Sequence, residues 1–171
     1  MMIVDFNKTI NIWIEAIKDY DFAELCRKPY PESWSLGQVY MHIVSESNYF
    51  LSQIKICASN SENANQEMSA NAKIMFVNNS FPDEIIVGPP TNALTPQPES
   101  KEQLMKELIN LKDEINKADI LISKSPFKGK TKHPGLNYFN ASDWFKFIEM
   151  HLRHHLRQKK RIDDFLTSKN K

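Results

Sequence analysis

The sequence predicts an all-α fold, a four-helix bundle with a long crossover loop between its second and third helices. Four segments repeat apolar residues at the spacing of a helix that buries one face. The chain has four glycines in 171 residues, which disfavours a turn-rich all-β fold. A polar and then proline-rich stretch, residues 59–99, separates the second helical segment from the third. With 41% hydrophobic and 25% charged residues, the composition favours one globular domain spanning residues 1–171.

The first two helices are placed by apolar spacing and by a capping signal. The first is expected from about Asp5 to Tyr20, with apolar positions at Phe6, Ile10, Ile12, Trp13 and Ile17. Ser33 or Ser35 is expected to cap the second helix, because Gln38 lies three residues after Ser35, the spacing of a capping box. This helix should end near Ala58.

The second half of the chain supplies the crossover and the other two helices. Within the crossover, a short helix is expected near residues 70–78. The third long helix follows Ser100, and its apolar stripe comprises Leu104, Leu108, Leu111, Ile115, Ile120 and Leu121. A turn-rich connector, residues 125–142, leads to the last helix, which Ser142 is expected to cap. Residues 168–171 are expected to form a disordered tail.

Composition and charge also narrow the class of function. The formal net charge is +1, so no global field attracts nucleic acid or an anionic membrane. The basic run at residues 153–161 is followed by Asp163 and Asp164, and nucleic-acid binding is not expected. No apolar stretch approaches the roughly 20 residues of a membrane span, and the N-terminus does not have the pattern of a signal peptide. Cys26 and Cys57 form no spaced framework, which favours a reducing, cytoplasmic location.

The last helix carries polar side chains on its apolar face. Counting about 100° per residue from His151, the arc within about 60° contains Trp144, Phe147, Ile148, Ile162, Phe165 and Leu166. His155 and Gln158 fall inside this arc, and His154 lies at its edge, where it is expected to be solvated. The opposite side, expected to face solvent, carries Lys146, Glu149, Arg153, Arg157, Lys160 and Asp164. The second helix is interrupted in the same way, since the apolar face around His42 also carries Gln38, Glu46 and Gln53.

These polar groups point to a metal site between the two helices. An unsatisfied polar group in a buried stripe costs about 1–3 kcal/mol, so the groups should satisfy one another or bind an ion. Three neutral imidazoles, from His42, His151 and His155, would leave a coordination position open for water or substrate. Imidazole binds Zn²⁺, Ni²⁺ and Fe²⁺, so the ligands alone do not identify the metal. The alternatives are a core histidine bonded to a carbonyl for His42, and a ligand role for His154 in place of His155.

Two further side chains are candidates for catalysis. Glu46 lies one turn beyond His42 and could orient an imidazole, act as general base or become a fourth ligand. The alternative for Glu46 is an ordinary surface position. Gln158 lies nearly one turn beyond His155 and is a candidate for a hydrogen bond to a bound water.

Three stretches together resemble the DinB/YfiT-like superfamily, whose members are metal-binding four-helix bundles. They are W-S-L-G-Q-V-Y-M-H-I at residues 34–43, H-P-G-L-N at 133–137 and D-W-F-x3-E-M-H-x2-H-H-x2-Q at 143–158. The resemblance covers most of the chain outside the crossover. It implies a divalent metal, zinc or nickel with iron or manganese as alternatives, bound by His42, His151 and His155. It also implies a homodimer that forms through bundle faces.

The resemblance further indicates two kinds of chemistry. Family members with known activity include S-transferases that use bacillithiol or a related thiol, and mycothiol-dependent isomerases, while others look like metal-dependent hydrolases. We therefore expect a small-molecule substrate and a metal that activates either a thiol, for S-transfer, or water, for hydrolysis. The alternative is a non-catalytic metal-binding or stress-related module on the same bundle.

Overall fold

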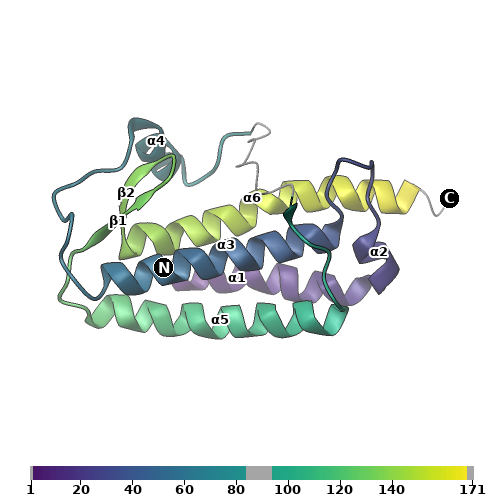
Figure 1. Ribbon diagram of the computed structural model, residues 1–171, viewed down its shortest axis with the longest axis horizontal. Coiled ribbons are helices and arrows are strands. Elements are labelled where there is room, and N and C mark those ends of the chain that lie inside the picture. Colours follow the sequence, from purple (N-terminus) through teal and green to yellow (C-terminus); the bar gives the residue numbers. More distant parts are fainter. Residues whose placement is uncertain (1, 84–93, 169–171) are drawn as a thin grey trace.

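The computed structural model describes residues 2–83 and 94–168, and its largest part is a bundle of four long helices (Figure 1). The elements in chain order are α1 (Met2–Ala16), the 3₁₀ turn η1 (Ile17–Asp19), α2 (Phe22–Cys26), α3 (Leu36–Cys57), α4 (Ala70–Asn78), α5 (Lys101–Lys124), β1 (Lys130–His133), β2 (Asn137–Asn140) and α6 (Ala141–Ser168). The predicted all-α bundle is confirmed, and its four helices are α1, α3, α5 and α6.

The directions of the helices explain the long crossover. α1 packs against α5 and α6, and α3 packs against the same two helices, so α1 and α3 lie on one diagonal of the bundle. α1 and α6 run in one direction, whereas α3 and α5 run in the other (Figure 1). Because α3 and α5 are parallel, the chain has to return along the length of the bundle between them. The short helix expected within this segment is present as α4.

The two predicted helix caps have different outcomes. α3 is capped by Ser35, whose hydroxyl accepts a hydrogen bond from the Gln38 amide while the Gln38 side chain accepts one from the Ser35 amide. The cap predicted for α6 at Ser142 is wrong, because α6 begins at Ala141 and Asn140 caps it. The Asn140 side chain accepts from the backbone amide of Asp143, and the Asp143 carboxylate accepts from that of Asn140. Asn140 ends β2, and the extended backbone of a strand suits a capping residue.

The core contains most of the predicted apolar stripes, with five exceptions. Trp13 and Trp144 are fully buried, and the Trp13 indole donates to the carbonyl of Leu152. Ile12, Ile120 and Leu121 are instead exposed. Tyr49 and Ile56, which helical spacing places on or near the His42 face of the second helix, are exposed as well. On α5 the inward face continues from Ile115 through Ala118, and residues 120 and 121 are rotated well away from that line.

Glu149 is a further correction, because this carboxylate was expected in solvent and is buried. α1 packs against that side of α6, and Thr9 on α1 donates a hydrogen bond to Glu149 at 2.8 Å. The charge is balanced by Arg153, one turn along α6, which donates to the carboxylate through Nε and Nη2. The predicted solvent face of α6 is therefore partly an interface with α1.

The connector before α6 contains a small antiparallel hairpin that the sequence pattern did not reveal. β1 pairs with β2 so that Lys130 lies opposite Asn140. The crossover attaches to this hairpin, since Met68 forms a bridge with Asn137 and the amide of Ser69 donates to the carbonyl of Leu136. The hairpin and α4 lie together over one end of the bundle (Figure 1).

Some expectations concern residues at or beyond the limits of the described structure. Residues 84–93 of the predicted crossover lie outside the described residues. Ser168, expected in the C-terminal tail, is the last residue of α6, and the rest of that tail also lies outside them. Among the helices that are described, none combines the length and apolar character needed to cross a bilayer.

Candidate metal centre

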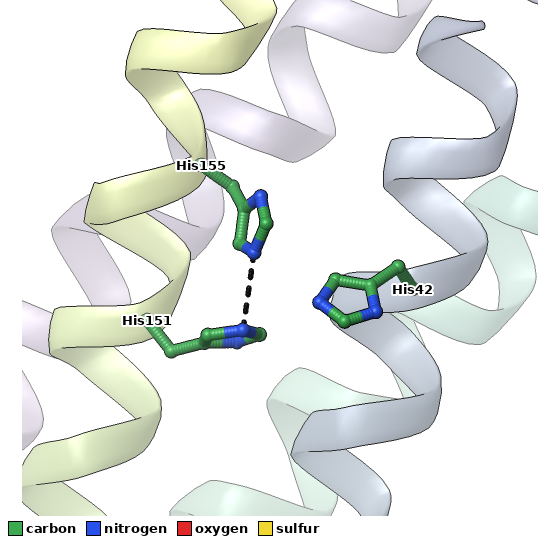
Figure 2. Close-up of side chains that lie close together, drawn as sticks. All are labelled: His42, His151 and His155. Carbon is green, nitrogen blue, oxygen red and sulfur yellow. Dashed lines mark hydrogen bonds between the residues drawn. The ribbon is translucent and has the colours of Figure 1, made fainter. Parts of the chain in front are cut away.

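Three histidine side chains from two helices converge inside the bundle (Figure 2). His42 comes from α3, and His151 and His155 come from consecutive turns of the adjacent helix α6. Their exposed fractions are 8%, 7% and 9%, so all three are buried without being fully sealed. Each offers one ring nitrogen, and these nitrogens lie within 4.8 Å of one another. The predicted convergence of the three imidazoles is confirmed.

The spacing of the ring nitrogens suits a common ion. Nitrogens bound to a tetrahedral zinc at about 2.0–2.1 Å lie about 3.3–3.4 Å apart. The Nε2 atoms of His151 and His155 are already 3.1 Å apart. The centroid of the His42 ring lies 5.2 Å from that of His151 and 4.8 Å from that of His155. A nitrogen of His42 lies within 4.8 Å of the other two, so one ion could reach all three rings. Imidazole nitrogen is also the donor that zinc, nickel and iron accept in proteins.

Gln158 fixes the tautomer of His155. The Gln158 side-chain oxygen lies 2.9 Å from Nδ1 of His155. An amide oxygen only accepts hydrogen bonds, so Nδ1 carries the proton and donates it. The lone pair of His155 is therefore on Nε2, which faces the other two imidazoles, and Gln158 orients the His155 ring.

His151 is held mainly by aromatic rings. Phe147 stacks on it at an interplanar angle of 11°, and Phe50 meets it edge-on with the ring centroids 5.6 Å apart. Its Nδ1 atom is buried and has no hydrogen-bond partner in the described part of the chain. Its Nε2 atom, in contrast, faces His155.

Burial keeps all three imidazoles neutral. It lowers the pKa of His42 to about 3, with additional repulsion from His155 and His154. Burial, and then the neighbouring histidines, hold the pKa of His151 well below its ordinary value. The pKa of His155 is also lowered by burial, although the hydrogen bond to Gln158 opposes the shift. A neutral imidazole is the form that binds a metal ion, so the site is prepared for one at neutral pH.

Aromatic side chains from outside the long helices complete the walls. The Trp34 ring, from the segment before α3, lies 4.9 Å from His42 between centroids. Phe81, from the crossover, lies 6.1 Å from His151 and 4.9 Å from His154. The sequence contains no periodicity that would have placed Phe81 at this site.

His154 differs from its expected solvated position. It is half-buried between Phe81 and Arg157, because the crossover covers this edge of α6. Arg157 only donates, so Nδ1 of His154 is the acceptor in their 2.7 Å hydrogen bond. Among the described residues, the group of converging histidines does not include His154.

Two arginines of the basic run hold the crossover in place. Arg153 donates to the carbonyl of Asn79, and Arg157 donates to the carbonyls of Phe81 and Pro82. Arg157 also forms an ion pair with Asp83. These two cations therefore serve intramolecular contacts.

Glu46 lies one turn beyond His42 on α3 and is not part of the cluster. Its carboxylate is half-buried, and burial raises its pKa. The Glu46 carboxylate makes no hydrogen bond or ion pair to another described residue, and the group of three histidines does not include it. Gln38, from the same face, has a structural role, since its side-chain amide donates to the carbonyl of Thr95.

Two surface cavities lie away from the histidines. One, of about 410 Å³, is lined at one end of the bundle by residues that include Cys57, Phe127 and Ser142. The other, of about 430 Å³, lies along α5 beside Met105 and Ile109. Neither lining has a set of metal-binding side chains, so the histidine cluster remains the centre with the clearest chemistry.

Comparison with known proteins identifies a family. The sequence model that describes the DinB superfamily matches residues 5–158 of the chain, which include all three histidines of the cluster. None of the curated proteins matches the chain.

Proposed function

Because the chain belongs to the DinB superfamily, we propose that it is a metal-dependent enzyme whose divalent ion is bound by His42, His151 and His155. The observation that carries this proposal is the convergence of three buried, neutral imidazoles from two helices. Zinc or nickel is the ion we expect, with iron as an alternative, because imidazole binds all three. Manganese is a further alternative that rests on the family resemblance alone. Such an ion would make a thiol or a water ionise near neutral pH.

The surrounding residues would prepare this chemistry in three ways. Gln158 holds His155 in the tautomer that presents Nε2. Trp34 and Phe81 exclude water from two sides of the cluster. Glu46, a half-buried carboxylate with a raised pKa, would accept the proton released by the thiol or water.

We propose either S-transfer from a low-molecular-weight thiol of the bacillithiol type or hydrolysis of a small molecule. The discriminating assay mixes the metal-loaded protein with such a thiol and an electrophile, and in parallel with esters and amides without thiol. Conjugation above the uncatalysed rate supports transfer, whereas cleavage without thiol supports hydrolysis. Metal binding without either reaction would support the non-catalytic module instead.

The metal site itself is tested by elemental analysis of protein purified without added metal. We expect about one divalent ion per chain in the wild type and a loss of most of it in His42→Ala and His155→Ala, since two imidazoles bind far more weakly than three. His133→Gln is the control, because this histidine lies outside the cluster and should leave the metal content unchanged. Equal metal content in all four proteins would contradict the assignment.

The assembly and location implied by the family resemblance also belong to the proposal. We propose a homodimer in the cytoplasm, acting on a small molecule rather than on nucleic acid. Sedimentation equilibrium of the metal-loaded protein would test the dimer directly.

A further inference from the structure

A directed chain of hydrogen bonds runs through the two histidines of α6 that belong to the cluster. His155 donates from Nδ1 to the side-chain oxygen of Gln158, which lies 2.9 Å away. Its other nitrogen, Nε2, lies 3.1 Å from Nε2 of His151, and Figure 2 marks this contact as a hydrogen bond. The lowered pKa values of both rings keep them neutral at pH 7, so each ring carries one proton.

Only one arrangement of these protons satisfies both hydrogen bonds. Since the single proton of His155 is on Nδ1, its Nε2 atom can only accept. The donor in the contact between the two rings is therefore Nε2 of His151. Nδ1 of His151 then carries no proton, and it has no hydrogen-bond partner among the described residues. The opposite tautomer of His151 would place two lone pairs against each other at 3.1 Å.

This hydrogen bond and a metal ion compete for the same nitrogen of His151. An imidazole nitrogen binds an ion through its lone pair, so it cannot carry a proton at the same time. Nε2 of His151 faces His155, and in the tautomer that donates to His155 its lone pair is not free. His155 has no such conflict, because its proton is on Nδ1.

We propose that His151 changes tautomer when the ion binds, so that its proton moves from Nε2 to Nδ1 while His155 keeps its proton on Nδ1. This inference rests on the proposed metal-dependent function. The N–H bond at Nε2 breaks and a new one forms at Nδ1, and water carries the proton between the two nitrogens. The ring is neutral before and after, and the lone pair left at Nε2 becomes the ligand.

The proton shift has a cost at His151 that His155 does not have. A histidine that binds a metal ordinarily donates its second N–H to an oxygen, and loss of this bond lowers metal affinity about 10- to 100-fold. Gln158 provides that oxygen for His155. Nδ1 of His151 is buried without an acceptor among the described residues, and the ring lies against Phe50 and Phe147. The two ligands from α6 are therefore unequally supported.

Nuclear magnetic resonance of the ¹⁵N-labelled protein tests the shift, because long-range correlations between ring protons and ring nitrogens show which nitrogen carries the proton. The metal is first removed with a chelator, and single His→Gln variants assign the signals. Before zinc is added, we expect the proton of His151 on Nε2 and that of His155 on Nδ1. With zinc bound, the proton of His151 should be on Nδ1, and that of His155 should stay where it was.

Two histidines outside the cluster are controls in the same spectra. Nδ1 of His133 accepts a hydrogen bond from the amide of Gly135 at 3.1 Å. Nδ1 of His154 accepts one from Arg157 at 2.7 Å. Both rings should therefore carry their proton on Nε2, with and without zinc.

The possible outcomes separate this inference from the proposed function. A proton on Nδ1 of His151 before zinc is added, or a proton that stays on Nε2 after zinc has bound, would overturn the shift and leave the metal site intact. Failure of the protein to bind zinc would instead overturn the proposed metal-dependent function, and the shift with it.

Discussion

One hydrogen bond determines which nitrogen of His155 is available. Gln158 accepts from Nδ1, so the lone pair on Nε2 is fixed toward His151 and His42. His151 has no equivalent partner on Nδ1 within the described residues and relies on the Phe147 and Phe50 rings. The tautomer of His155 is therefore fixed by a side-chain hydrogen bond at Nδ1, whereas that of His151 is not fixed in this way.

Replacing Gln158 tests this control at the scale of one residue. Gln158→Leu removes the acceptor and leaves Nδ1–H of His155 without a partner, so we expect metal affinity to fall by about 10- to 100-fold. Gln158→Glu retains an oxygen acceptor and should bind the metal at least as tightly as the wild type. Competition with a chromophoric chelator gives both affinities. Equal affinity in the Leu variant would show that the hydrogen bond does not prepare His155.

At the scale of the element, α6 shows what periodicity can predict. Its 3.6-residue repeat places His151 and His155 on the buried face, and the structure confirms both positions. The same repeat placed Glu149 in solvent, because it cannot show that α1 also covers α6. The Asn140 cap and the position of Phe81 depend on the hairpin and the crossover, whose contacts are non-local. Sequence alone therefore predicted the two helices that carry the histidines better than the aromatic side chains around them.

The buried Glu149, between α1 and α6, leads to a prediction about how the stability of the protein depends on pH. Burial raises the pKa of this carboxyl, but hydrogen bonds from Arg153 and Thr9 outweigh it, and the net pKa lies below the ordinary value of 4.5. The carboxylate therefore stabilises the fold above about pH 4.5, and this stabilisation is lost as the pH falls through the lower folded-state pKa. Glu149→Gln should reduce the free energy of unfolding at pH 7 by roughly 1–3 kcal/mol.

Urea unfolding at pH 7 and at pH 3.5 would test this dependence. The difference between wild type and Glu149→Gln should shrink at the lower pH. Glu15→Gln is the control, because its pair with Lys18 is exposed and should change stability by less than about 1 kcal/mol. A difference that does not vary with pH would contradict the role assigned to the charge.

For the whole molecule, the described parts of the crossover contact both helices that carry the histidine cluster. On one side, Arg153 and Arg157 bind its backbone at residues 79–82. On the other side, its return segment lies against the first turn of α3, where Gln38 donates to the carbonyl of Thr95 and Ser35 donates to Gln97. The described parts of the crossover on either side of residues 84–93 are therefore attached to α6 and to α3.

Gly37 permits this attachment on the α3 side, and a matched glycine makes the idea testable. A Cβ atom at Gly37 would lie 2.9 Å from both the Leu25 carbonyl oxygen and the ring of Pro98. Since a backbone oxygen and a proline ring cannot yield as a flexible side chain does, Gly37→Ala should destabilise the protein by about 1–3 kcal/mol. The measurement is urea unfolding combined with limited proteolysis, in which cleavage between α4 and α5 should become faster.

Gly135→Ala is the control, because a Cβ atom added there would have no atom of another described residue within 4 Å. The stability of this variant should stay close to that of the wild type. If both variants were equally stable, the return segment would be able to move away from α3 without a loss in the free energy of unfolding. The contacts of the crossover with α6 would then be the ones that stabilise it.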